Sequence, residues 1–259
     1  MTALRPNPLA LVAIGAAAGV LSGLFGIGGG TLIVPALVLW LGMSQRLAAG
    51  TSVAAILPTA IVGAITYGVQ GNVDWVAAIA LAVGIIAGAQ LGSFLLAKLR
   101  VAVLQWSFMA FLAVVIVSLW FVVPSRDAQI ELGLLTILLL GLTGFITGIL
   151  SGLLGVGGGI VVVPILMFFF GSSDLIAKGT SLVMMIPGSL SGTLGNFRRG
   201  NVDLRAALFV GVAASAFVPV GAFLAAWVDP FWGNVAFSLY LIFLLAQLLV
   251  RQLRRKPRA

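Results

Sequence analysis

The chain has 259 residues, of which 61% are hydrophobic and only 8% are charged, and its mean hydropathy is +1.23. Soluble domains carry roughly 25% charged residues, so this composition indicates an integral membrane protein. The sequence contains no Cys and no His, which excludes disulfides, thiolate and imidazole chemistry and the usual transition-metal ligands. We therefore expect no metal and no cofactor. The net charge is +8, but the basic residues are spread between apolar runs, so they predict no nucleic-acid surface.

Charge-free runs divide the chain into candidate membrane segments. In chain order these runs are residues 6–45, 47–73, 75–97, 101–125, 132–173, 179–197, 206–228 and 230–250. A helix crosses a bilayer with about 20 apolar residues, so six runs fit one crossing each and two are about twice as long. Each long run has a glycine cluster near its midpoint, at 26–30 and 155–159. We predict that each cluster breaks its run into two helical segments, which gives ten segments in total.

The chain also contains an internal repeat. Shifted by 129 residues, Ser22–Asp74 aligns with Ser151–Asp203 without a gap, and 22 of the 53 positions are identical. The shared positions include the glycine cluster, the sequences GTS and GNVD, and two prolines. Because five segments per copy is an odd number, the second copy should lie inverted in the membrane. The predicted fold is an all-α polytopic membrane protein of two inverted five-segment repeats, residues 1–125 and 126–259.

The distribution of basic residues fits this inversion. With ten segments and both termini in the cytoplasm, only Arg126 and Lys178 fall outside, in keeping with the positive-inside rule. The basic C-terminal tail, residues 251–258, is suited to anionic lipids on the inner face of the membrane. Each glycine-broken pair of segments could equally be a re-entrant hairpin, since a hairpin leaves the topology of the other segments unchanged.

The glycine clusters are the main candidate for a binding site. Non-helical backbone at membrane depth is costly unless it is buried in protein or lines a polar cavity. A new helix should begin after each break, at Thr31 and Ile160, and its first N–H groups have no partner within the helix. These donors and the positive end of the helix dipole favour an anion. The predicted site consists of Gly28, Gly29, Gly30 and Thr31 with Gly157, Gly158, Gly159 and Ile160.

Other glycines are assigned to helix packing alone. Gly15, Gly19 and Gly23 recur at every fourth residue, and so do Gly144, Gly148 and Gly152. Such spacing lets two membrane helices approach closely.

Several polar residues could add to the site. The hydroxyl pairs Thr51/Ser52 and Thr180/Ser181 lie near the starts of later helices, although hydroxyls in membrane helices often bond their own backbone. Asn72 and Asn201 lie in the GNVD turns, where helix capping assisted by the adjacent aspartates is the simpler interpretation. Gln90 is a polar group inside a span. Lys178 either attracts anions at an entrance or is a solvated loop charge.

The positions of the acidic residues bear on transport direction. All six lie at run boundaries: Asp74, Asp127, Glu131, Asp174, Asp203 and Asp229. An anion leaving the cell needs no coupling carboxylate, because a negative interior favours efflux by about 2.3 kcal/mol per charge per 100 mV. The sequence therefore favours export over uptake. No nucleophile–base pair is evident, which argues against an enzyme.

The paired motifs resemble those of a known family. GLFGIGGGTLIVP at 23–35 and GLLGVGGGIVVVP at 152–164, each followed by GTS, a proline and GNVD, are similar to the TauE/SafE family of sulfite and organosulfonate exporters. The resemblance implies a prokaryotic inner-membrane permease that moves small sulfur-containing oxyanions. Alternating access would then come from rocking of one repeat-derived bundle against the other. Two alternatives remain open: an importer of thiosulfate- or sulfate-like anions, and a non-transporting membrane scaffold or assembly factor.

Overall fold

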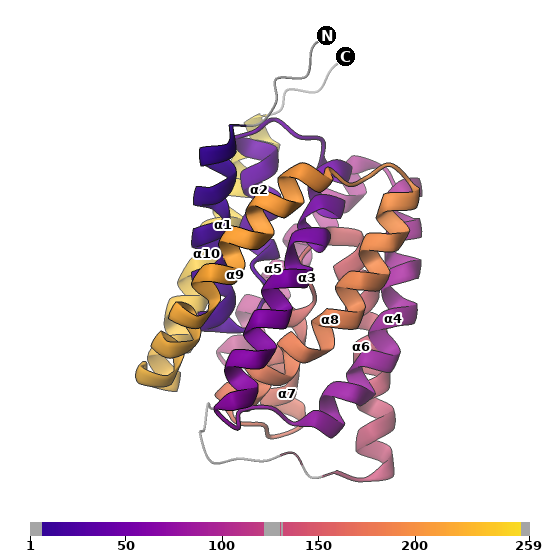
Figure 1. Ribbon diagram of the computed structural model, residues 1–259. Coiled ribbons are helices and arrows are strands. Elements are labelled where there is room, and N and C mark those ends of the chain that lie inside the picture. The colour runs from indigo at the N-terminus through magenta and orange to yellow at the C-terminus, as the bar shows by residue number, and fades with distance from the viewer. Residues whose placement is uncertain (1–6, 122–129, 131, 255–259) are drawn as a thin grey trace.

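The structure is a computed structural model that describes residues 7–121, 130 and 132–254 as a bundle of ten helices (Figure 1). Ten helical segments were predicted, and the described part of the chain confirms them. The boundary predicted between the repeats, at 125/126, lies outside the described residues. The helices are α1 Pro8–Phe25, α2 Gly30–Leu39, α3 Gln45–Val69, α4 Trp75–Lys98, α5 Val101–Leu119, α6 Leu134–Leu154, α7 Gly159–Phe169, α8 Asp174–Arg198, α9 Leu204–Trp227 and α10 Pro230–Arg254.

The helix bounds follow the sequence repeat. Shifted by 129 residues, the bounds of α3 become those of α8, and the bounds of α4 become those of α9. The caps repeat as well: the carboxylates of Asp74 and Asp203 accept the N–H groups of Ala77 and Ala206, at 2.9 and 3.0 Å. A side-chain cap of this kind is worth about 1 kcal/mol. The expected capping groups were the asparagines of the GNVD turns, assisted by the aspartates; in the structure the aspartates themselves cap the two helices.

The glycine breaks join a long helix to a short one. α2 and α7 have 10 and 11 residues, so at about 1.5 Å per residue each is roughly half as long as the hydrocarbon core of a bilayer is thick. Each short helix begins one residue before the predicted start. From its break, α2 returns to the end of the bundle where α1 begins, and α7 returns to the end where α6 begins (Figure 1). Each pair thus forms a helical hairpin that turns back at the glycine break.

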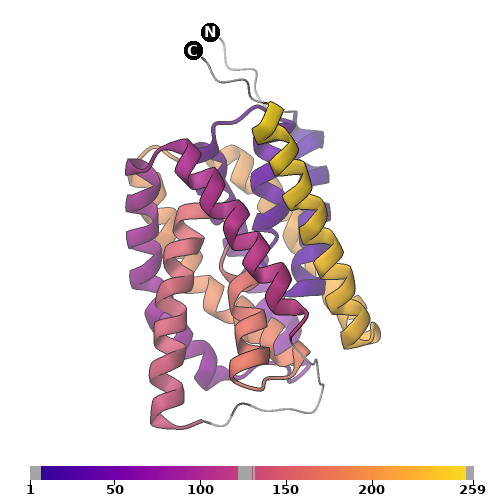
Figure 2. The ribbon, with the colours of Figure 1, turned by 180° about the vertical axis from the view of Figure 1, so that it is seen from behind.

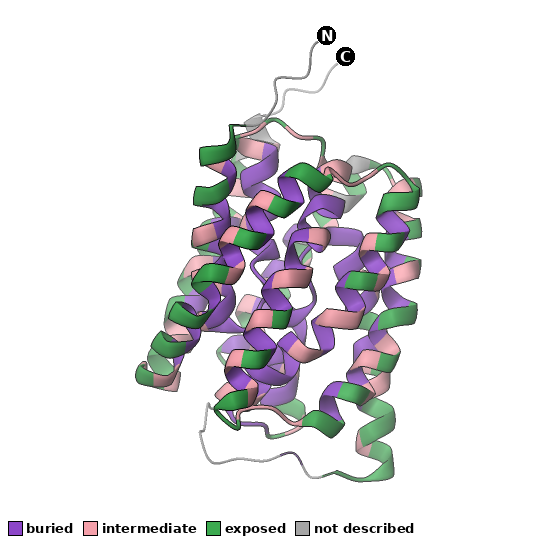
Figure 3. Ribbon diagram, viewed as in Figure 1, coloured by how far each residue is buried: buried purple, intermediate pink, exposed green. Residues whose placement is uncertain are grey.

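The centre of the bundle is the pair α3 and α8, with α9 beside α3 and α4 beside α8. α1 packs on α9, and α6 packs on α4, so the long helix of each hairpin packs against a helix of the other copy. Buried residues gather on the inward faces and exposed residues on the outer faces of these helices (Figure 3). Among the described residues, six helices are long and apolar enough to cross a membrane: α1, α3, α4, α6, α9 and α10. The molecule is a multi-pass membrane protein.

The surface carries the aromatic pattern of a membrane protein. All six tryptophans are exposed, and each lies in the first six residues of a helix, in its last residue or directly after it: Trp40, Trp75, Trp106, Trp120, Trp227 and Trp232. Indole rings favour the interface between lipid tails and water, so these positions mark the two edges of the membrane-embedded part.

The glycines spaced at every fourth residue serve helix packing, as predicted. A Cβ placed on Gly19 of α1 would meet the carbonyl oxygen of Ala214 in α9. One placed on Gly148 of α6 would lie 2.6 Å from the carbonyl oxygen of Ile85 in α4. Only hydrogen at these positions lets the two backbones come so close.

Candidate functional site

Each glycine break is a short left-handed stretch between two helices. Gly26 ends α1 with φ at 69°, and Gly28 and Gly29 follow with φ at 72° and 75°. In the second break the three corresponding glycines, within 155–158, have φ between 77° and 90°. Residues with a Cβ rarely adopt this conformation, which explains why the clusters consist of glycine. Every residue of 26–31 and 155–160 is buried.

The two breaks lie against each other inside the bundle. A Cβ placed on Gly30 would lie 2.5 Å from the carbonyl oxygen of Gly155, and one on Gly159 would meet the carbonyl oxygen of Gly26. Each short helix therefore begins against the turn of the other copy. The structure thus brings together the two predicted half-sites, which are 129 residues apart in the sequence.

At each break, the backbone N–H groups of four consecutive residues have no acceptor among the described residues. The hydrogen bonds of α2 and α7 begin with those accepted by the carbonyl oxygens of Gly29 and Gly158. The N–H groups of residues 28–31 and 157–160 form no hydrogen bond within the described part of the chain. A buried polar group without a partner costs about 1–3 kcal/mol. Such donors, at two helix N-termini where the helix dipole is positive, are suited to hold an oxyanion.

Two apolar side chains fill the space beside the breaks. Ile56 of α3 and Met185 of α8 occupy equivalent positions in the two copies, and both are fully buried. From a Cβ placed on Gly28, Met185 Sδ lies 2.8 Å away and Ile56 Cγ2 lies 3.2 Å away. From one placed on Gly157, Ile56 Cδ1 lies 2.8 Å away. These two side chains close the breaks in this conformation.

The predicted serines reach the opposite break. Ser52 Oγ donates to the carbonyl oxygen of Gly155 at 2.6 Å. Ser181 Oγ donates to the carbonyl oxygen of Gly26 at 2.7 Å. Both serines are buried, and both bonds join one copy to the other. In this conformation the serines hold the breaks in position.

The predicted threonines reach the opposite GNVD turn. Thr51 Oγ1 accepts the N–H of Asp203, and Thr180 Oγ1 accepts the N–H of Asp74, both at 2.9 Å. Each hydroxyl therefore supports the start of a helix from the other copy. Together the hydroxyl pairs form a reciprocal set of bonds between the two copies.

Thr31, the one predicted site residue with a hydroxyl inside a break, contacts α10. Its Oγ1 lies 3.1 Å from the hydroxyl of Tyr240. The equivalent residue of the second break is Ile160, which is buried and apolar. The two half-sites therefore differ in polarity.

Three amide residues of the predicted set lie in other settings. Asn72 Nδ2 donates to Gln70 Oε1 at 3.4 Å, within the α3–α4 turn. Asn201 Nδ2 is buried and has no hydrogen-bond partner among the described residues. The carbonyl groups of both asparagines lie against the glycine of the opposite GTS motif. Gln90 Nε2 donates to the carbonyl oxygen and hydroxyl of Ser191, at 2.7 and 3.1 Å, and so joins α4 to α8.

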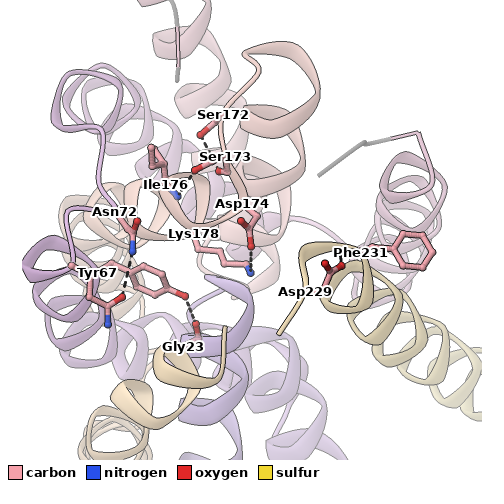
Figure 4. Close-up of polar contacts among 11 residues, drawn as sticks. Gly23, Tyr67, Asn72, Ser172, Ser173, Asp174, Ile176, Lys178, Asp229 and Phe231 are labelled. Atoms are coloured by element: carbon pink, nitrogen blue, oxygen red, sulfur yellow. Dashed lines mark hydrogen bonds and ion pairs between the residues drawn. The ribbon is translucent and has the colours of Figure 1, made fainter. Parts of the chain in front are cut away.

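Lys178 is a buried residue at the edge of the first break (Figure 4). Its ammonium pairs with the carboxylate of Asp174 at 3.1 Å. Its Cα, Cβ and Cγ lie 2.6 to 3.0 Å from a Cβ placed on Gly26. Close by, the hydroxyl of Tyr67 donates to the carbonyl oxygen of Gly23 at 2.6 Å. Lys178 is therefore not the solvated loop charge considered from the sequence.

Comparison with known proteins assigns the family. The family described as sulfite exporter TauE/SafE matches residues 2–119 and 140–259. The chain belongs to the TauE/SafE family. No solved structure matches it.

Relatives of this TauE/SafE chain are named as probable membrane transporters. It is 31% identical over 167 residues to the probable membrane transporter protein MJ0441 of Methanocaldococcus jannaschii, and the match covers 60% of each chain. It is 25% identical over 223 residues to YunE and 28% identical over 207 residues to YdhB, both probable membrane transporter proteins of Bacillus subtilis. These two matches cover 74% and 77% of this chain and 79% and 84% of the relatives.

The structure places further residues beside the breaks that were not predicted from the sequence. Besides Ile56 and Met185, the buried hydroxyl of Thr147 has no hydrogen-bond partner in the described residues. Its Cγ2 lies 2.6 Å from a Cβ placed on Gly158, whereas Ala18 takes this place beside Gly29. A signal was present, because a polar side chain inside an otherwise apolar span marks a candidate site.

Proposed function

We propose that this TauE/SafE protein is a permease that exports small sulfur-containing oxyanions such as sulfite or organosulfonates. The N–H groups of residues 28–31 and 157–160 would hold the oxyanion between the two breaks. The observation that supports this most is that these buried donors form no hydrogen bond with the described residues. The family description supports transport and the class of substrate, and the names of the relatives support transport.

The chemistry of the breaks favours an anion over a cation or a neutral solute. Two helix N-termini meet there, and each carries the positive end of a helix dipole. The glycines place no side chain between the backbone and a bound oxyanion. The oxygens of a sulfite or sulfonate group can therefore approach several N–H groups at once. Because the sequence contains no Cys and no His and the family is one of transporters, we assign the protein no enzymatic activity.

Binding requires Ile56 or Met185 to move aside. Each stands two residues before a proline inside its helix, Pro58 in α3 and Pro187 in α8. A proline removes one hydrogen bond from a helix and lets it bend at that point. We propose that bending of α3 or α8 withdraws one of the two side chains and opens the breaks to one side of the membrane.

The two copies would be inverted relative to each other, with both termini in the cytoplasm of a prokaryotic cell and the bundle in its inner membrane. α1 begins and α10 ends at the same end of the bundle, where α4 and α8 also end (Figures 1 and 2). The helix termini and turns at this end carry Arg46, Lys98, Arg100, Arg198, Arg199, Arg205, Arg251 and Arg254. The opposite end carries Lys178 alone among the described basic residues. The positive-inside rule therefore supports this orientation.

Export is the favoured direction because a negative cell interior drives anions outward, by about 2.3 kcal/mol per charge per 100 mV. The test is sulfite flux from proteoliposomes under an imposed membrane potential of either sign, with protein-free liposomes as the control. We expect potential-dependent sulfite movement only where the protein is present. If neither sulfite, sulfoacetate nor thiosulfate moves under any gradient, the transport proposal is wrong and a scaffold role takes its place.

A further inference from the structure

The buried ion pair of α8 has no counterpart in the other copy. Asp174 and Lys178 stand where the first copy has Gln45 and Ala49, four residues apart at the start of α3. Both helices nevertheless span 25 residues with matching bounds. The first copy thus serves as an internal control, because it shows that the helix forms without the pair.

The Asp174–Lys178 pair is buried much more deeply than a surface salt bridge. The side chains of Lys178 and Asp174 are only 10% and 4% exposed. The second carboxylate oxygen of Asp174 is buried and has no hydrogen-bond partner among the described residues. Removing two charges from water costs several kcal/mol per ion, and a pair with an unsatisfied oxygen offsets this poorly. The pair is therefore a weak candidate for a purely stabilising role.

The pair is fixed directly to the first glycine break. The carbonyl oxygen of Lys178 accepts the hydroxyl of Ser181 at 2.7 Å, and the same hydroxyl donates to the carbonyl oxygen of Gly26. The carbon chain of Lys178 lies on Gly26 itself. The carbon chain of Lys178 thus lies at the rim of the proposed oxyanion site, and its ammonium pairs with Asp174 at the start of α8 (Figure 4).

We propose that Lys178 is a second anion-binding group at the outer rim of the site, and that Asp174 is its tethered counter-ion. This inference rests on the proposed function. An oxyanion leaving the breaks replaces the carboxylate on the ammonium, and the carboxylate returns when the oxyanion departs. Carboxylate, sulfite and sulfonate all present oxygens to the ammonium, so one charge-assisted bond is exchanged for another. Release to the outside is fast because Asp174 competes for Lys178.

The surrounding groups allow this exchange. Asp229, the carboxylate of the α9–α10 turn, is exposed and accepts the N–H of Phe231 at 2.9 Å. The hydroxyl of Tyr67 is already bonded to Gly23. Among the described residues at this rim, Asp174 is the buried carboxylate. It therefore competes directly with an anion for the ammonium of Lys178.

The first test replaces the pair with the residues of the other copy, in the double variant Asp174→Gln/Lys178→Ala. Purified protein is assayed for sulfite affinity by calorimetry, for sulfite flux in proteoliposomes and for thermal stability. We expect the half-saturating sulfite concentration to rise at least tenfold, with a melting temperature close to that of the wild type. A lower melting temperature with unchanged affinity would show a structural role and overturn the proposal.

The second test is Asp174→Asn, which keeps the shape of the side chain and removes the competing charge. We expect sulfite to bind at least tenfold more tightly and to leave at least tenfold more slowly. Affinity and release equal to those of the wild type would overturn the proposal.

If the wild type moves no sulfur oxyanion, the proposed function fails. The calorimetric comparison then decides alone, with sulfate and sulfite as probes: tighter binding by Asp174→Asn supports the anion site, and equal or absent binding overturns it.

Discussion

At the scale of single residues, Gly28 and Gly157 are both required to be glycine by their backbone conformation and by the little space around them. Each has a positive φ, 72° and 82°, and each lies against the side chain of Ile56. A larger residue would be strained in its backbone and would also occupy the space that an oxyanion needs. Beside these two glycines the polar groups of the candidate site are backbone N–H groups, because the nearest side chains, Ile56 and Met185, are apolar.

Shortening these side chains should relax the selection of substrate by size. Ile56→Ala or Met185→Ala opens space directly beside the breaks, so larger organosulfonates should compete with sulfite more effectively, by about tenfold or more. Each variant should also lose roughly 2–5 kcal/mol of stability because a buried side chain is truncated. The measurement is inhibition of sulfite flux by a series of sulfonates of increasing size.

The matched control is Ile14→Ala. Ile14 is 1% exposed on α1 and belongs to a core cluster that contains neither Ile56 nor Met185. It should lose similar stability and keep the size selection of the wild type. An unchanged inhibition series in all three variants would contradict the role given to Ile56 and Met185.

At the scale of helices, the strongest packing joins the two copies. α1 of the first copy packs on α9 of the second, and α6 of the second packs on α4 of the first. The repeat unit of the sequence is thus not the packing unit of the fold. Rows of glycine make both contacts, since they place the helix backbones close together.

Gly148→Ala should therefore disrupt assembly, whereas Gly141→Ala on the same helix should not. A Cβ on Gly148 would lie 2.6 Å from the carbonyl oxygen of Ile85, but one on Gly141 has its nearest neighbour at 3.8 Å. Alanine favours a helix at both positions, by roughly 1 kcal/mol over glycine, so only the contact with α4 distinguishes them. The yield of monodisperse detergent-solubilised protein measures the effect. Equal yields would contradict the packing role.

The same helices show what the sequence could and could not predict. Ten segments and both breaks followed from charge-free runs, glycine clusters and the repeat. The pairing of α1 with α9 did not, because apolar patterns alone do not specify a partner helix. The burial of polar side chains could not be predicted either. Asp174 and Asp229 both lie at run boundaries, yet Asp174 is only 3% exposed, whereas Asp229 is an exposed residue. Membership of a polar residue in a buried pair depends on tertiary packing.

At the scale of the whole molecule, the charge distribution supports the proposed orientation, with the basic end of the bundle in the cytoplasm. This orientation can be measured directly, since the chain contains no cysteine and single cysteines give no background. Gln70→Cys lies in the α3–α4 turn and Arg205→Cys at the start of α9, and both positions are exposed. Because these lie at opposite ends of the bundle (Figure 1), a membrane-impermeant maleimide should label the first in intact cells and the second only after permeabilisation. The reverse pattern would contradict the orientation.

The most direct test of the anion site is sulfite flux through Gly158→Leu and Gly171→Leu in parallel proteoliposomes. Both glycines have positive φ, 90° and 64°, so leucine strains the backbone at either position. A Cβ on Gly158 meets Thr147 at 2.6 Å, whereas Gly171 has nothing within 4 Å. We expect Gly158→Leu to insert into the membrane and lose sulfite flux by about a hundredfold or more, and Gly171→Leu to keep most of it. Normal flux through Gly158→Leu would contradict the central role given to the glycine breaks.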